Sequence, residues 1–126
     1  MMQNPKKKVL VVEDNPMNMI LIKEILAANG FEVIEAYNGH DAIKRVSEEM
    51  PDLILMDLNL PEMDGVTATK ILKSNSPGKD IPIVAITASA MKGDEEKILA
   101  EGFDGYIAKP IEMKKFMKAV ALFIKK

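Results

Sequence analysis

The 126-residue chain contains no cysteine and only one histidine. Without cysteine it can form no disulfide framework, no thiolate metal site and no thiol nucleophile. The histidine, His40, follows the turn signal Asn38-Gly39 and is expected at the surface. No second histidine is present to build a metal site with it, so any metal site has to use oxygen ligands.

A strong net charge and long apolar runs are also absent. Seventeen Lys and Arg against 19 Asp and Glu give a net charge of −2, which provides no argument for direct nucleic-acid binding. The apolar run Val9–Val12 stops at Glu13 and is too short for a signal peptide or a membrane span. The length and the 48% apolar content predict one soluble, cytoplasmic domain without a membrane partner. Residues 1–7 are expected to form a basic N-terminal extension.

Short apolar runs alternate with longer amphipathic segments along the chain. The runs predict five strands, at Val9–Val12, Phe31–Ala36, Leu53–Met56, Ile81–Ile86 and Phe103–Ala108. The other segments predict five helices: from the Asn15-Pro16 cap to Asn29, about Asp41–Glu49, Val66–Lys73, roughly Gly93–Glu101, and Glu112–Ile124. This alternation predicts an α/β fold with a parallel sheet, right-handed crossovers and helices on both faces.

Polar residues follow four of the predicted strands. They are Glu13 and Asp14 after the first strand, Asp57 after the third, Thr87 after the fourth and Lys109 after the fifth. Because parallel strands end at the same edge of a sheet, these side chains are expected at one rim, where open α/β sheets bind ligands. If the first and third strands are neighbours, three carboxylates converge and raise one another's pKa unless a cation intervenes. Oxygen ligands of this kind suit Mg²⁺.

Asp57 is the candidate nucleophile at this rim. It ends the buried run Leu53–Met56, and a carboxylate can attack phosphorus to form an acyl phosphate. The Thr87 hydroxyl can donate a hydrogen bond to a phosphoryl oxygen, and Lys109 supplies a positive charge. From an edge strand Lys109 must cross roughly 10 Å, about two strand spacings, so it reaches Asp57 only if its loop leans inward.

The ordered set of motifs resembles the response regulator receiver family of two-component signalling. The resemblance runs from about Lys8 to Ile124 and is carried by Glu13-Asp14, Met56-Asp57, Leu60-Pro61-Glu62-Met63-Asp64-Gly65, Thr87-Ala88 and Lys109-Pro110. It implies a flavodoxin-like (βα)5 fold with a five-stranded sheet in the order 2-1-3-4-5. It also implies a CheY-like stand-alone receiver domain over residues 8–126, with no effector domain.

The resemblance further implies roles for the rim residues. Asp57 would be phosphorylated by a histidine kinase or a histidine phosphotransfer protein. Mg²⁺ would be bound by Asp14, Asp57 and the backbone carbonyl of Asn59, with Glu13 acting through water. Thr87 would bind the phosphoryl group.

The resemblance assigns Lys109 to the phosphoryl group as well, makes the Lys109-Pro110 peptide bond cis, and offers a switch. Phosphorylation adds roughly two negative charges near neutral pH. Thr87 would be drawn toward them, and Tyr106 would rotate into the space behind it. The face formed by the fourth helix, the fifth strand and the fifth helix would then change for a downstream protein partner.

Two other functions stay open at this point. The first is a Mg²⁺-dependent phosphohydrolase, but a haloacid-dehalogenase-type enzyme needs an aspartate two positions after the nucleophile, where this chain has Asn59. We therefore expect no enzyme beyond self-phosphorylation and slow self-dephosphorylation. The second is a phosphorylation-independent adaptor, against which the intact set of rim residues argues. A monomer is expected, and dimerisation is left open.

Overall fold

The computed structural model describes residues 6–58, 60, 64–74, 78–88 and 94–124. Within them, strands and helices alternate along the chain. The elements are β1 (Lys8–Val12), α1 (Pro16–Ala28), β2 (Glu32–Ala36), α2 (Gly39–Glu49), β3 (Leu53–Asp57), α3 (Gly65–Ser74), the short 3₁₀ turn η1 (Gly78–Asp80), β4 (Ile83–Thr87), α4 (Asp94–Ala100), β5 (Gly105–Ala108) and α5 (Met113–Phe123). No helix in these ranges is long and apolar enough to span a membrane.

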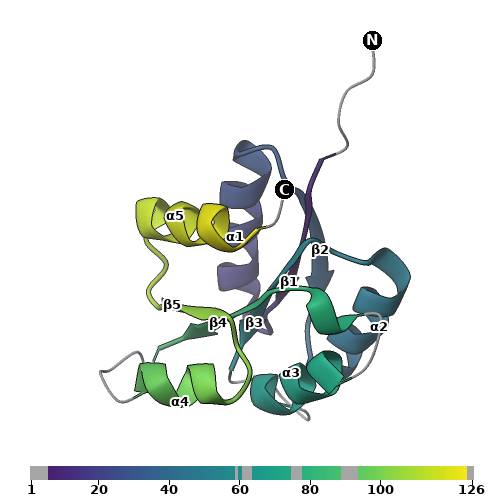
Figure 1. The fold of residues 1–126 in the computed structure, drawn as a ribbon. Coiled ribbons are helices and arrows are strands. Elements are labelled where there is room, and N and C mark those ends of the chain that lie inside the picture. Colours follow the sequence, from purple (N-terminus) through teal and green to yellow (C-terminus); the bar gives the residue numbers. More distant parts are fainter. Residues whose placement is uncertain (1–5, 59, 61–63, 75–77, 89–93, 125–126) are drawn as a thin grey trace.

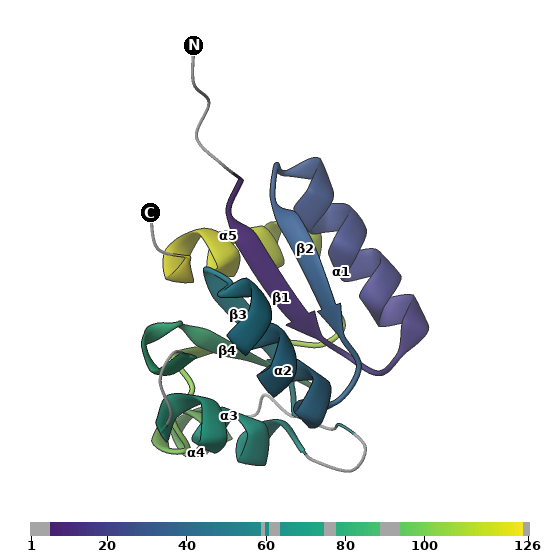
Figure 2. The ribbon, with the colours of Figure 1, turned by 90° about the vertical axis from the view of Figure 1, so that its right-hand side faces the viewer.

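All five strands are parallel and lie in the order β2-β1-β3-β4-β5. Helices α1 and α5 cover one face of the sheet, and α2, α3 and α4 cover the other (Figures 1 and 2). This is the flavodoxin-like arrangement, and the predicted fold and strand order are confirmed. Since β1 and β3 are neighbours, their carboxyl ends lie side by side at the rim.

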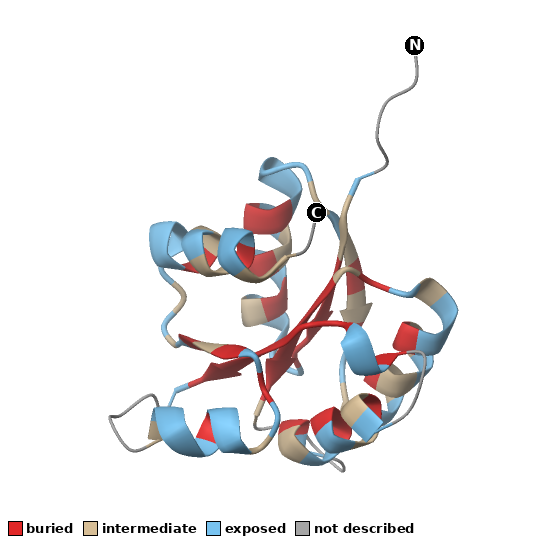
Figure 3. Ribbon diagram, viewed as in Figure 1, coloured by how far each residue is buried: buried red, intermediate tan, exposed pale blue. Residues whose placement is uncertain are grey.

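The sheet is the core of the molecule, with one apolar layer on each face. Figure 3 shows the central strands as a buried block with helices whose outer surfaces are exposed. In β1, Val9 and Val11 pack toward α1 and α5, whereas Leu10 and Val12 pack toward α2, α3 and α4. Residues Leu53–Asp57 of β3 are buried throughout, so the strand that carries Asp57 is fixed from both faces.

Two asparagine caps set the starts of α1 and α2. The Asn15 side chain accepts hydrogen bonds from the N–H groups of Met17 and Asn18 at 2.9 and 3.1 Å. The Asn38 side chain does the same for Asp41 at 2.8 Å. Each cap satisfies N–H groups that have no partner inside the helix. The first cap, predicted from Asn15-Pro16, holds the chain just after Glu13 and Asp14.

Several local expectations differ from the structure. In the first helix the apolar Ile20 is 52% exposed, and its neighbour Met19 is buried instead. Strands β4 and β5 begin two residues later than predicted, and η1 was not predicted. The later start of β5 has a clear reason: the Asp104 carboxylate accepts the Ile83 N–H at 2.8 Å, which engages the chain before the ladder begins.

Candidate functional site

The structure brings the carboxyl groups of Glu13, Asp14 and Asp57 into one cluster at the rim, where Thr87 ends the next strand. Glu13, Asp57 and Thr87 are almost wholly buried, at 0, 2 and 2% exposure. Asp14 lies beside them with an exposed side chain. Buried acids normally need compensating partners, so this concentration of carboxyl groups at a strand edge calls for cations.

Lys109 reaches the cluster from the far edge of the sheet. Its Nζ lies 3.2 Å from Asp57 Oδ2 and 3.3 Å from Glu13 Oε1. Its backbone N–H donates to the Thr87 carbonyl at 2.8 Å, which continues the β4–β5 pairing past the end of the strand. The loop therefore leans inward, as the predicted reach requires, and the Lys109-Pro110 peptide bond is cis.

The neighbouring carboxylates hold the Lys109 ammonium group in its charged form. Burial alone would lower the pKa of Lys109, but the carboxylates of Asp57 and Glu13 outweigh burial and raise it. Burial raises the pKa of Glu13, and contact with Asp57 raises it further, against the opposing effects of the Asn15 N–H and Lys109. Lys109 thus stays charged, while the pKa of Glu13 lies above that of an ordinary glutamate.

The acidic cluster has the composition of a site for a hard cation. One carboxylate oxygen from each of Glu13, Asp14 and Asp57 lies within 4.8 Å of the others. Glu13 Oε2 accepts the Asn15 N–H at 3.1 Å, and the buried Oε1 faces the Lys109 ammonium at 3.3 Å. Oxygen donors with spare lone pairs fit Mg²⁺. Asn59, whose carbonyl was expected to contribute, lies outside the described residues.

Gly65 sets the distance between β3 and the start of α3. A Cβ atom on Gly65 would lie 2.3 Å from the backbone oxygen of Asp57, which no side chain can tolerate without movement. The Gly65 N–H donates to the Leu58 carbonyl at 3.3 Å. The sequence shows Gly65 only as part of the family motif, and its close approach to the strand that carries Asp57 is visible only in the structure.

The two proposed switch residues lie on the α4 side of the sheet. Thr87 borders a cavity of about 170 Å³, whose other lining residues are Leu58, Val66, Asp94, Lys97, Ile98, Glu101 and Phe103. Tyr106 packs against the same apolar layer, and its hydroxyl donates to Glu95 Oε2 at 3.3 Å. Tyr106 does not line this cavity. The cavity beside Thr87 therefore exists, but the Tyr106 ring lies outside it.

Comparison with known proteins agrees with this site. The family model for the response regulator receiver domain matches residues 9–121. The polar-differentiation response regulator DivK of Brucella anthropi is 44% identical over 118 residues, covering 94% of this chain and 96% of that protein. DivK of Brucella ovis is 43% identical over the same span, with the same coverage of both chains.

Solved structures show the same fold. The receiver domain of the sensor histidine kinase PA1611 from Pseudomonas aeruginosa PAO1 is 34% identical, with a TM-score of 0.86 over 94% of this chain and 98% of that one. A magnesium ion is coordinated in the active-site cleft of that structure. The chemotaxis response regulator CheY4 of Vibrio cholerae is 26% identical, with a TM-score of 0.89 over 95% of this chain and 100% of that one. From its family match and its DivK relatives, this chain belongs to the response regulator receiver family of two-component signalling.

Proposed function

We propose that Asp57 is the residue that accepts the phosphoryl group and that its donor is a histidine kinase or a histidine phosphotransfer protein. The observation that carries this assignment is the buried Asp57 carboxylate at the end of β3, held 3.2 Å from the Lys109 ammonium. The residue is fixed by a strand buried on both faces, and phosphoryl transfer depends mainly on such positioning and on charge stabilisation.

The reaction exchanges one bond to phosphorus for another. A carboxylate oxygen of Asp57 forms a bond to phosphorus as the bond from phosphorus to the donor's histidine nitrogen breaks, and the electron pair of that bond stays on the imidazole. Lys109 stabilises the negative charge on the phosphoryl oxygens, and the Thr87 hydroxyl donates a hydrogen bond to one of them. Both groups already lie at the rim, so little rearrangement precedes transfer.

We infer that Asp14 and Asp57, with Glu13 behind them, hold Mg²⁺ during this reaction. The spacing of the three carboxylates supports the assignment, as does the magnesium in the cleft of the PA1611 receiver domain. When bound, the ion would offset repulsion between the carboxylates and the phosphoryl oxygens.

Output is assigned to the face formed by α4, β5 and α5. Phosphorylation would draw Thr87 toward the new charge, open the space beside the 170 Å³ cavity and let the Tyr106 ring leave Glu95 and turn inward. A downstream protein would read that change. In this proposal residues 8–126 form the receiver unit, residues 1–7 are an extension, and the protein acts as a monomer that turns over no external phosphomonoester.

Acetyl phosphate tests the acceptor directly. In the presence of Mg²⁺, intact-mass spectrometry should show one added phosphoryl group on the native protein and none on Asp57→Asn. The matched control is Asp80→Asn, which changes an exposed aspartate in η1, before β4 begins. This variant should be phosphorylated as the native protein is. Modification of Asp57→Asn at the native rate would refute the assignment.

A further inference from the structure

Strand β5 is an edge strand of the sheet. Among the residues that the structure describes, β4 is its one neighbouring strand. Edge strands of natural proteins usually carry charged residues that discourage pairing with other chains. The opposite edge strand, β2, follows this rule with Glu32 and Glu35, but the four residues Gly105–Ala108 of β5 carry no charge.

The backbone of β5 directs hydrogen-bonding groups to its outer side. The Lys109 N–H is used toward β4, where it donates to Thr87. Because alternate residues of a strand address the same neighbour, the backbone groups of Ile107 also face β4. Those of Tyr106 and Ala108 therefore face away from the sheet, toward the outside.

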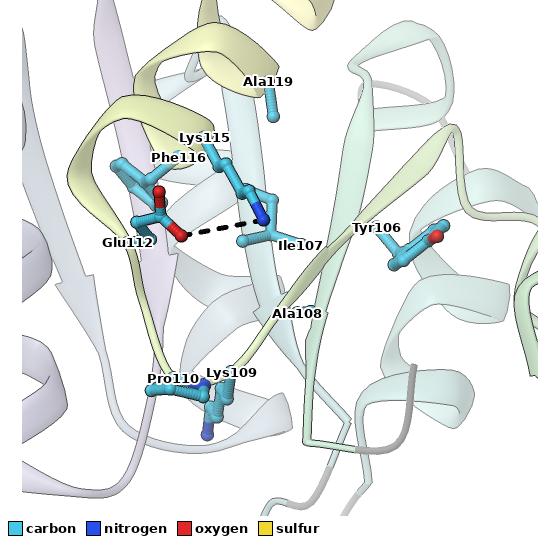
Figure 4. Close-up of a pocket in the computed structure, with 9 residues that line it drawn as sticks. All are labelled: Tyr106, Ile107, Ala108, Lys109, Pro110, Glu112, Lys115, Phe116 and Ala119. Carbon is cyan, nitrogen blue, oxygen red and sulfur yellow. Dashed lines mark ion pairs between the residues drawn. The ribbon is translucent and has the colours of Figure 1, made fainter. Parts of the chain in front are cut away.

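A groove lies next to these groups. Tyr106, Ile107 and Ala108 line one wall of a cavity of about 440 Å³, and Lys115, Phe116 and Ala119 of α5 line the other. Figure 4 shows the Tyr106 ring on the opposite side of the strand from the α5 residues. The Tyr106 backbone therefore borders the groove, whereas its ring lies on the α4 side of the strand.

The charges that flank the groove differ between its two sides. On the α5 side, Lys114, Lys115 and Lys118 are exposed. The one exposed acid there, Glu112, pairs with Lys115 at 3.6 Å (Figure 4), and an exposed pair of this kind is easily exchanged. On the α4 side the first turn is acidic, with Asp94, Glu95 and Glu96.

This charge distribution argues against a second copy of the chain as the occupant. Two copies related by a twofold axis would pair their β5 strands antiparallel, with the corresponding faces of both sheets on the same side. Lysine-rich α5 would then lie next to α5 of the other copy, and acidic α4 next to α4. Like charges would meet on both faces, and such contacts oppose association.

We propose that an extended, acidic peptide segment of a partner protein adds to the outer side of β5 as a sixth strand. Its main chain would bond to Tyr106 and Ala108, and its acidic side chains would point to the α5 side and pair with Lys115 and Lys118. The peptide would belong to the downstream partner of the proposed function, and its biological role rests on that function. A strand bound to the Tyr106 backbone also restrains the residue that carries the switching ring.

A designed peptide tests the mode of binding. The probe is an acetylated, amidated hexapeptide of alternating glutamate and valine, which places every glutamate on one side of an extended chain. Titrated at millimolar concentration into ¹⁵N-labelled, unphosphorylated protein, it should shift the amide signals of Tyr106 and Ala108 and slow their hydrogen exchange. Since this titration needs no phosphorylation, its result is independent of whether Asp57 is the acceptor.

Three controls make the outcome decisive. The same peptide with its inward-facing backbone nitrogens methylated, or with lysine in place of glutamate, should bind much more weakly. Lys115→Glu should weaken binding roughly three- to fivefold, the size expected for one exposed charge pair, whereas Lys44→Glu on α2 should not. Phosphoryl uptake from acetyl phosphate by Lys115→Glu should equal that of the native protein, which shows that the variant is folded.

Three results would overturn the proposal. Equal binding of the methylated peptide would show that no strand is added. Equal binding of the lysine peptide would show that charge does not select the occupant. Concentration-dependent dimerisation that protects the amides of Tyr106 and Ala108 without peptide would assign the edge to a second copy.

Discussion

Removing the charge of Lys109 by the substitution Lys109→Met should destabilise the metal-free protein, and the loss should depend on pH. The ammonium lies 3.2 Å from Asp57 and 3.3 Å from Glu13. At an effective dielectric constant of about 20, each contact is worth roughly 5 kcal/mol before the desolvation of the ammonium is subtracted. Breaking a buried ion pair on one side costs about 3–5 kcal/mol in measured cases.

Two features reduce the expected loss to about 2–4 kcal/mol near pH 8. The Lys109 side chain is 21% exposed, so solvent already screens part of the attraction. Glu13 can also lose its uncompensated negative charge by taking up a proton. Burial has already raised its pKa, and loss of Lys109 raises this pKa further. A carboxyl group with a raised folded-state pKa binds more protons when folded, so its destabilising effect disappears as the pH falls toward the unfolded value of 4.5.

The loss of stability is measured by urea denaturation at pH 5, 7 and 8. Lys109→Met and the native protein are compared with a chelator present. The difference in free energy of unfolding should be largest at pH 8 and should shrink toward pH 5. Lys97→Met, which changes an exposed lysine on α4, is the control and should stay within about 0.5 kcal/mol at every pH. A loss of equal size at all three values would mean that packing of the lysine stem, not charge, is what matters.

Three further predictions concern Gly65, Asp104 and Glu13. Gly65→Ala should cost about 1–3 kcal/mol and slow phosphoryl uptake, because the added Cβ would lie 2.3 Å from the backbone oxygen of Asp57; thermal denaturation and acetyl phosphate kinetics measure both. Asp104→Ala should cost about 1–2 kcal/mol through loss of the hydrogen bond from the Ile83 N–H and of the contact with Lys73, both at 2.8 Å, and it should leave phosphoryl uptake unchanged. Glu13→Gln should weaken Mg²⁺ binding about tenfold by calorimetry while raising the stability of the metal-free protein, and equal Mg²⁺ affinity would remove Glu13 from the metal site.

The sequence predicted where the rim residues lie, because the fold converts position along the chain into position in space. Every candidate followed a buried run, and parallel strands end at one edge whatever their side chains contact. The placement of Glu13, Asp57 and Thr87 therefore needed only the element order. The reach of Lys109 could not be decided this way, since it depends on how its loop turns, and spacing carries no information on that.

Other features could not be predicted from the sequence, because they depend on packing between helices and strands. The apolar stripe of α1 includes Met19 rather than Ile20, although both side chains are apolar and adjacent, and only the direction of the helix against the sheet separates them. The steric role of Gly65 depends on how closely α3 begins beside β3. A turn signal and a close-approach glycine have the same sequence, so the structure is needed to tell them apart.

One strand links the chemistry of the site to its readout. Lys109 follows β5 directly and is held by Asp57 and Glu13, while Tyr106 lies three residues earlier on the same strand. A phosphoryl group on Asp57 would compete for the Lys109 ammonium and would change the pull on the end of β5. Because β5 is an edge strand with one neighbour, it is held by half as many ladder contacts as a central strand. A strand held less firmly than the central ones thus joins Asp57 to the surface assigned to partners.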